Sequence, residues 1–281
     1  MNIQKGCMNM KKITALVLAL MLLAVSSCAL ADHLDDIKKS GKLVVGAEVS
    51  FAPFEFYMTG EDGKEYEAGF EMDLARQIAE DLGVELEVAD QQFNGLITAL
   101  QVGEVDLVIS GMTATEERRN AVDFSDTYYV GEQPFVVREA DVEKYKTYDD
   151  IKGKMVGAQL GTIQQTILET QFPECESLLL PKVPTLLMEL LNGNIEGVIC
   201  SRIVATSYMN IYDGLAFAEI PVDSNKNGVG VAVAKGDDNA TLLAAVNATV
   251  ERVVADGTYD AWVEKACAQN AELLKAQEAA E

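Results

Sequence analysis

The sequence is poor in histidine and in basic residues. One histidine, His33, occurs among 281 residues, and 22 lysines and arginines stand against 45 acidic residues. A lone histidine, which we expect in a disordered start of the chain, argues against histidine-based metal sites and nucleophilic triads. A net charge of −23 argues against nucleic acid as a partner, because phosphate binding needs clustered lysine and arginine. We therefore expect no metal, no cofactor and no nucleic acid.

Cysteine is scarce as well. Cys7 and Cys28 lie in the first 28 residues, and Cys175, Cys200 and Cys267 follow much later. The last three are an odd number without the spacing of metal ligands. At most one disulfide can form among them, and three reduced thiols are the alternative.

The N-terminus has the layout of an export signal. Lys11 and Lys12 precede an apolar run over 13–25, and small residues follow. The run is shorter than the roughly 20 residues that span a bilayer. We interpret residues 1–27 as a signal peptide and expect an extracytoplasmic protein.

Two cleavage sites fit this signal. The stretch 25–28, Val-Ser-Ser-Cys, has the form of a lipobox, which predicts lipidation of Cys28 and anchoring at the cell membrane. The stretch 29–31, Ala-Leu-Ala, fits ordinary cleavage and would give a soluble periplasmic or secreted protein. We favour the lipid anchor.

Short apolar runs alternate with longer amphipathic ones from residue 42 onward. This alternation predicts an α/β fold with a largely parallel sheet, and the pattern repeats after a break near residue 130. We predict strands at 43–45, 84–88, 105–109, 135–138, 155–159, 178–180, 197–200, 215–220 and 228–234. We predict helices at 69–82, 94–101, from 115, at 147–152, 162–171, 185–191, 202–210, 240–256 and 258–267, and a frayed helix beyond.

Several helix ends have clear signals. Asn94 and Thr115 are expected N-caps, Gly83 is a natural stop, and Glu71 lies in a first turn that favours acids. No linker rich in glycine, serine or proline separates the two halves. We therefore expect two lobes packed together, with a ligand site in the cleft between them.

Three motifs together resemble a known family. They are Ala52-Pro53-Phe54-Glu55-Phe56, the segment 69–79 that reads GFEMDLARQIA, and the segment 110–118 that reads SGMTATEER with Asp-Phe-Ser at 123–125. Their order and spacing resemble family 3 extracellular solute-binding proteins of ABC transporters over about residues 40–268. The resemblance implies a type II periplasmic binding protein fold, with two lobes, two chain crossings and a ligand cleft.

The resemblance also implies the division of the chain. The first lobe would comprise 40–127 plus 229–281, and the second 132–224. Hinges would lie near 128–131 and 225–228, where glycine and asparagine tolerate unusual backbone angles.

The same resemblance implies the binding residues. Arg118 would hold the ligand carboxylate with its planar guanidinium, helped by the segment 110–113. Aromatic walls and a helix N-terminus in the second lobe would complete the pocket. The predicted set is Glu48, Phe51, Phe93, Ser110, Gly111, Met112, Thr113, Arg118, Gln159, Gly161, Thr162 and Ser201.

One position departs from the family pattern. The family places an aspartate after the strand 197–200 to hold the ligand ammonium, whereas this chain has Ser201. A hydroxyl is a weaker acceptor for an ammonium than a carboxylate is. We expect Glu48 to supply the negative charge, which favours a polar or basic amino acid, with an organic anion as an alternative.

The preferred function is capture of an amino acid by a monomer that delivers it to an ABC permease, without catalysis. One alternative is an exported enzyme resembling cyclohexadienyl dehydratases, with Glu48 as general acid. The other is a ligand-sensing subunit of a membrane receptor.

Overall fold

A computed structural model describes residues 32–60, 62–224 and 227–278, with side chains up to residue 273. The predicted signal peptide, the lipidation site Cys28 and part of the second predicted hinge lie outside these residues. Within the described ranges, no helix is both long enough and apolar enough to cross a membrane.

The first sheet is assembled from two distant stretches of the chain. Its strand order is β4-β1-β5-β12-β6, and β12 follows β6 by more than 100 residues. β1 pairs in parallel with β4 and β5, whereas β12 is antiparallel to β5 and β6. The bounds are β1 Lys42–Ala47, β4 Glu85–Asp90, β5 Leu107–Val108, β6 Val122–Phe124 and β12 Ala232–Ala234.

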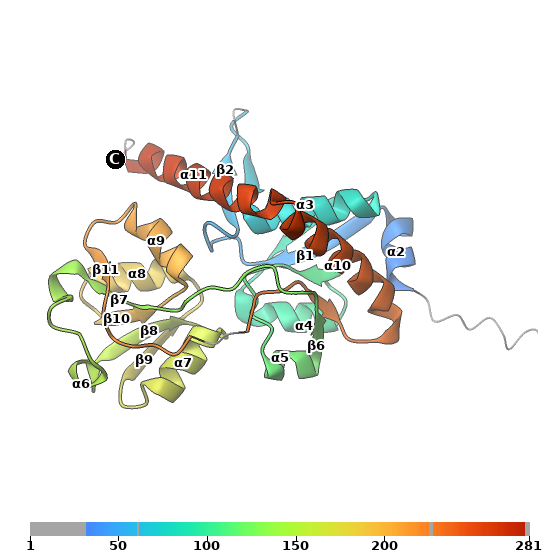
Figure 1. The fold of residues 1–281 in the computed structure, drawn as a ribbon. Helices are drawn as coiled ribbons and strands as arrows, with labels where there is room; N and C mark the ends of the chain where they lie inside the picture. Colours follow the sequence, from blue (N-terminus) through green and yellow to red (C-terminus); the bar gives the residue numbers. More distant parts are fainter. Residues whose placement is uncertain (1–31, 61, 225–226, 279–281) are drawn as a thin grey trace, which may run out of the picture.

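Helices cover both faces of this sheet (Figure 1). Leu43 and Val45 of β1 pack in one core cluster with the helix α3, and Val44 packs in another with α4. A strand that alternates its side chains between two apolar layers fits this arrangement. The helices are α2 His33–Ser40, α3 Phe70–Leu82, α4 Leu96–Gln101, α5 Glu116–Ala121, α10 Ala240–Ala255 and α11 Thr258–Glu278, with short turns η2 Phe93–Gly95 and η4 Asp237–Asn239.

The second sheet is built from one continuous stretch. Its order is β11-β7-β10-β8-β9, with β10, β8 and β9 parallel, β7 antiparallel to β10, and β11 antiparallel to β7. Its strands are β7 Phe135–Arg138, β8 Met155–Gln159, β9 Glu176–Leu180, β10 Gly197–Ile199 and β11 Leu215–Phe217. Around it lie η3 Glu139–Asp141 and the helices α6 Tyr148–Ile151, α7 Ile163–Gln171, α8 Val183–Leu191 and α9 Arg202–Met209.

Both sheets are mixed, so the expectation of a largely parallel sheet is wrong in this respect. The parallel pairs are β1–β4, β1–β5, β8–β9 and β8–β10, whose strands are connected through helices. The antiparallel pairs all involve β12 in the first sheet or β7 in the second. A hairpin of β2 Phe56–Thr59 and β3 Glu65–Ala68 was not anticipated. Asn94 lies inside η2 rather than capping a helix.

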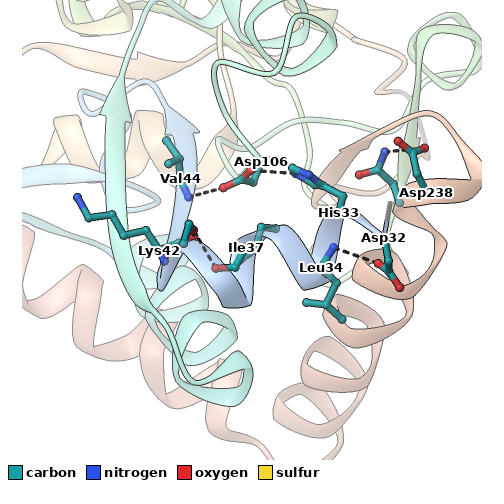
Figure 2. A network of polar contacts seen from close by, with 10 residues as sticks. Asp32, His33, Leu34, Ile37, Lys42, Val44, Asp106 and Asp238 are labelled. Carbon is teal, nitrogen blue, oxygen red and sulfur yellow. Dashed lines mark hydrogen bonds and ion pairs between the residues drawn. The ribbon is translucent and has the colours of Figure 1, made fainter. Parts of the chain in front are cut away.

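The start and the end of the described chain are more regular than expected. His33 begins α2 and pairs through its Nε2 with the Oδ1 of Asp106 at 2.9 Å (Figure 2). The other carboxylate oxygen of Asp106 accepts the Val44 N–H at 2.8 Å, which ties α2 to β1. The prediction of a disordered start at His33 is therefore wrong. α11 continues to Glu278 instead of fraying at Ala268.

Several contacts join the two lobes. The long helix α11 runs from the first lobe toward α9 of the second (Figure 1), where Asn270 donates a hydrogen bond to Ser207. The Tyr208 hydroxyl donates to the Ser50 carbonyl at 3.3 Å.

Cys175, Cys200 and Cys267 are all free, so these three thiols form no disulfide. The lobe boundaries and the hinge role of 128–131 remain predictions.

Candidate functional site

A cavity lies between the two lobes, with an empty volume of about 540 Å³ that partly opens to solvent. The first lobe contributes loops at the ends of β1 and β5, and the second contributes the loops after β8 and β10. Both sets follow carboxyl ends of parallel strands, where ligand sites of α/β sheets are found. The lining residues are Glu48, Phe51, Phe54, Phe93, Ser110, Gly111, Thr113, Arg118, Tyr129, Gly131, Gln133, Gln159, Thr162, Ile163, Gln164, Ser201, Asn227 and Val229.

Arg118 brings a positive charge to the cavity. Thr115 caps α5 by accepting the Arg118 N–H at 3.2 Å, which fixes the first turn of this helix. The guanidinium donates to the Thr113 carbonyl at 2.8 Å and, across the cleft, to the Gly161 carbonyl at 3.0 Å. It also lies over the Phe93 ring at 5.2 Å. Burial lowers the pKa of Arg118 to about 10, so the group stays charged at neutral pH.

The wall from Ser110 to Gly111 is supported from behind by two buried acids. Glu71 of α3 accepts the Gly111 N–H at 2.7 Å and the Tyr128 hydroxyl at 2.6 Å. The Ser110 hydroxyl donates to Glu55 at 2.7 Å. Gly111 has a φ of +56°, and a Cβ there would lie 2.9 Å from the Phe51 ring. Only glycine therefore lets the wall approach this ring.

The two supporting acids differ in ionisation. Burial raises the pKa of Glu55 well above its usual range, and the neighbouring Glu71 charge raises it further. Burial also raises the pKa of Glu71, but the hydrogen bonds from Tyr128 and Gly111 lower it. Glu71 is therefore the member of the pair that is held closer to the charged form, because it accepts from two donors whereas Glu55 accepts only from Ser110.

Glu48 brings a negative charge to the same cavity. It follows β1, is only 3% exposed, and its backbone N–H donates to the Ser110 hydroxyl at 3.0 Å. Ser50 donates to one carboxylate oxygen, and Gln159 donates to the other at 3.1 Å. Burial raises the pKa of Glu48 to about 6, although the bonds from Ser50 and Gln159 oppose the rise. The group is thus ionised at neutral pH and titrates in a weakly acid range.

The second lobe lines the cavity with neutral side chains. Thr162 caps α7 by accepting the Gln165 N–H at 3.4 Å and donates to the Gln159 carbonyl at 2.6 Å. The Gly161 N–H donates to Gln165 at 2.7 Å. The predicted cradle of free N–H groups at 161–162 therefore has the Gly161 N–H already occupied. Ser201 precedes α9 and is 4% exposed, and its hydroxyl does not cap that helix.

Ten of the twelve predicted binding residues line the cavity. Met112 does not, because it points into the core and is 1% exposed. Gly161 contributes its carbonyl to Arg118 rather than a surface to the cavity.

Gln133 and Gln164 were not anticipated. Gln164 donates to Gln133 at 2.6 Å, and both line the cavity. Neither belongs to a motif, although Gln164 lies two residues after Thr162, where the predicted helix 162–171 begins, which was a usable signal. Phe54 and Tyr129 line the cavity as well, although Phe54 was noted only as part of a family motif and not as a binding residue.

Within the described ranges, no cluster of histidine, cysteine or acidic residues could hold a metal ion.

Comparison with known proteins identifies the chain's relatives. The sequence profile of the bacterial extracellular solute-binding proteins, family 3, matches residues 43–269. The chain belongs to this family. The resemblance drawn from the three motifs is therefore confirmed.

Individual family 3 relatives are similar over most of their length. The arginine-binding extracellular protein ArtP of Bacillus subtilis is 36% identical over 234 residues, which cover 82% of this chain and 88% of ArtP. The L-cystine-binding protein TcyJ of Escherichia coli is 33% identical over 244 residues, covering 86% of this chain and 89% of TcyJ.

Solved structures of the family support the fold. An amino acid ABC transporter substrate-binding protein from Streptococcus pneumoniae, bound to L-arginine, superposes with a TM-score of 0.80 at 35% identity, covering 84% of this chain and 97% of that one. The ancestral amino acid-binding protein AncCDT-1, a precursor of cyclohexadienyl dehydratase, gives 0.75 at 33% identity, covering 83% and 98%. The predicted two-lobed α/β fold of type II periplasmic binding proteins is confirmed.

Proposed function

We propose that this family 3 protein captures a polar or basic amino acid in the cavity between its lobes and delivers it to an ABC importer. The observation that carries the proposal is that a cation, Arg118, and an acid, Glu48, line the same cavity. A zwitterion buried there would find a partner for its carboxylate and for a cationic group. The names of relatives that bind arginine or cystine support an amino acid ligand.

The predicted residues that line the cavity each have a role in this proposal. Arg118 binds the carboxylate, the Thr113 hydroxyl adds a hydrogen bond, and Ser110 and Gly111 form the adjoining wall. Phe51 and Phe93 enclose the ligand side chain, and Glu48 with Gln159 binds its polar end. Thr162 and Ser201 close the pocket from the second lobe. A ligand that contacts both lobes stabilises the closed arrangement, which the permease then recognises.

A panel of free amino acids in a thermal-shift assay tests the proposal. A ligand at about 100 times its Kd adds roughly 2.7 kcal/mol to the free energy of unfolding. We expect at least one polar or basic amino acid to raise the Tm of ligand-free protein by several degrees. If none does so at millimolar concentration, the proposed function is wrong.

We propose further that the protein is exported, is anchored through Cys28, works as a monomer and is not an enzyme. Labelling with a radioactive fatty acid in the native host, with Cys28→Ser as control, tests the anchor.

The competing enzyme function draws on one observation, a buried Glu48 with a raised pKa, which suits a general acid. We expect no phenylpyruvate from prephenate, and its formation would favour the dehydratase.

A further inference from the structure

The first part of α11 is anchored in the first lobe. The Tyr259 ring packs against the rings of Phe70 and Tyr128, whose centroids lie 5.7 Å and 5.6 Å away. Further along the helix, the Lys265 Nζ lies 2.9 Å from a carboxylate oxygen of Asp73 in α3. These contacts fix α11 to α3 and to the core of the first lobe.

The later part of α11 contacts the second lobe. Asn270 donates a hydrogen bond to the Ser207 hydroxyl of α9, a helix that connects β10 to β11 in the second sheet. Both side chains are buried, with Asn270 3% and Ser207 8% exposed. Figure 1 shows α11 extending from the first lobe to α9. The two lobes are therefore joined by a buried side-chain bond in addition to the stretches where the chain passes between them.

The helix α9 also forms one edge of the cavity. Ser201, the N-cap of α9, lines the cavity, and its carbonyl accepts the Ala205 N–H at 2.8 Å. Ser207 lies six residues further along the helix, or about 9 Å along its axis. The next residue, Tyr208, donates to the carbonyl of Ser50 in the first lobe. Because a short helix moves as one piece, the contact at Ser207 helps to fix the position of Ser201.

The bond between Asn270 and Ser207 lies outside the cavity. Both residues are described, and neither is among those that line it. The bond therefore affects ligand binding through the relative placement of the lobes. A bond that forms when the lobes close and breaks when they open stabilises the closed arrangement. It raises the fraction of protein that is competent to bind, and hence the apparent affinity, by the same factor for every ligand.

We propose that Asn270 is a positioning residue, which favours the closed lobes through its bond to Ser207 and so raises the affinity for any ligand of the cavity. The inference rests on the proposed function and adds to it a residue outside the binding site. Removing one neutral buried hydrogen bond should lower the ratio of closed to open protein about fivefold. A bond that persisted in the open lobes would act as a pivot and leave this ratio unchanged.

Small-angle X-ray scattering of the full protein, purified free of ligand, tests the effect on the lobes. Ser207→Ala removes the acceptor, Asn270→Ala removes the donor, and a double variant removes both. We expect all three to have a larger radius of gyration than the wild type. The double variant should match the single ones, because the two residues share one bond. Thr206→Ala is the matched control, an exposed change on the same helix that should scatter like the wild type.

Isothermal titration with L-arginine and with L-lysine tests the effect on binding. We expect both affinities to fall two- to fivefold in Ser207→Ala and in Asn270→Ala, by the same factor for the two amino acids. Thr206→Ala should bind both like the wild type. A saturating amino acid should return the radius of gyration of each variant to that of the liganded wild type, because the binding residues are intact.

Two results would overturn the inference. One is a lower midpoint of urea unfolding with unchanged scattering and affinity, which a purely structural bond or a pivot would give. The other is a loss of affinity that differs more than threefold between the two amino acids. If neither amino acid binds, the scattering comparison alone decides the role of Asn270, and the thermal-shift panel separately decides the proposed function.

Discussion

The two walls of the cavity differ in chemistry. The first lobe supplies both ionised lining groups, Arg118 and Glu48, and supports its wall with two buried acids. The second lobe supplies neutral amides and hydroxyls, of which Gln159 and Thr162 bond to the chain around them. We propose that the charged wall selects the ligand and that the neutral wall closes over it without adding a further charge that would have to be desolvated.

Replacing Arg118 by lysine should have the largest effect on binding. Lysine keeps the charge but loses the planar fork that holds two carboxylate oxygens and the two carbonyls. We expect ligand affinity to fall by about 100-fold, which corresponds to about 2.7 kcal/mol. Arg119→Lys is the matched control, because Arg119 is exposed and is absent from the cavity lining. Equal losses of affinity in Arg118→Lys and Arg119→Lys would show that the arginine in the charged wall has no special role in binding.

The two supporting acids should lose different amounts of stability on the same substitution. In Glu71→Gln, an amide replaces the carboxylate that accepts from both Gly111 and Tyr128, and one donor is left unpaired. We expect a loss of about 2.5 kcal/mol in the free energy of unfolding. Glu55→Gln should cost less than about 1 kcal/mol, since an amide resembles the neutral acid. Urea unfolding at pH 7 compares them, and equal losses would contradict the assigned ionisation.

Glu48→Gln should stabilise the ligand-free protein. Folding raises the pKa of Glu48 from 4.5 to about 6 because the carboxylate is buried. The resulting cost is absent below about pH 4.5, grows through pH 6 and is complete above it, where it amounts to about 2 kcal/mol. Urea unfolding should show this gain at pH 8 and none at pH 4.5.

Binding should show the opposite trend at this position. Wild-type affinity for a ligand with a cationic group should fall as the pH drops below 6, because protonated Glu48 no longer attracts a cation. The Glu48→Gln protein should bind more weakly and without this pH dependence. Glu104→Gln, an exposed change outside the cavity, serves as control. A pH-dependent affinity that persists in Glu48→Gln would assign the titration to another group.

The neutral wall should give the smallest effects. Gln164 donates to Gln133 at 2.6 Å, and replacing either by alanine removes one neutral hydrogen bond. We expect affinity to fall about fivefold for each, or about 1 kcal/mol. The double variant should lose little more than either single one, because the two share the bond. Losses of 100-fold would show that the second lobe selects the ligand as strongly as the first.

Much of the fold follows from local sequence. The bounds of β7 and β8 agree with the predicted strands 135–138 and 155–159, because apolar runs ended by charged or glycine-rich segments leave little choice. Thr115 caps its helix as expected, and Thr162 caps the helix that was predicted to begin with it. Arg118, Glu48 and the aromatic residues Phe51 and Phe93 were assigned to one cavity by the resemblance to the family, and all four line it.

Other features needed the tertiary structure. The hairpin β2–β3 was missed because its strands are short and Tyr57 and Tyr66 remain exposed, so no apolar alternation marks it. His33 looked unstructured because its partner Asp106 lies more than 70 residues away. A hydrogen-bond partner that is distant in sequence leaves no local pattern.

The three motifs by themselves determined the family, the two-lobed fold and the arginine at the cavity. They did not determine the state of the acids. Glu71 has the pattern of a first-turn acid facing solvent, yet it is fully buried against Tyr128 and Gly111. Burial and partners set a pKa, and both depend on segments brought together from across the chain. The ionisation of these buried acids was therefore decided only by the tertiary structure.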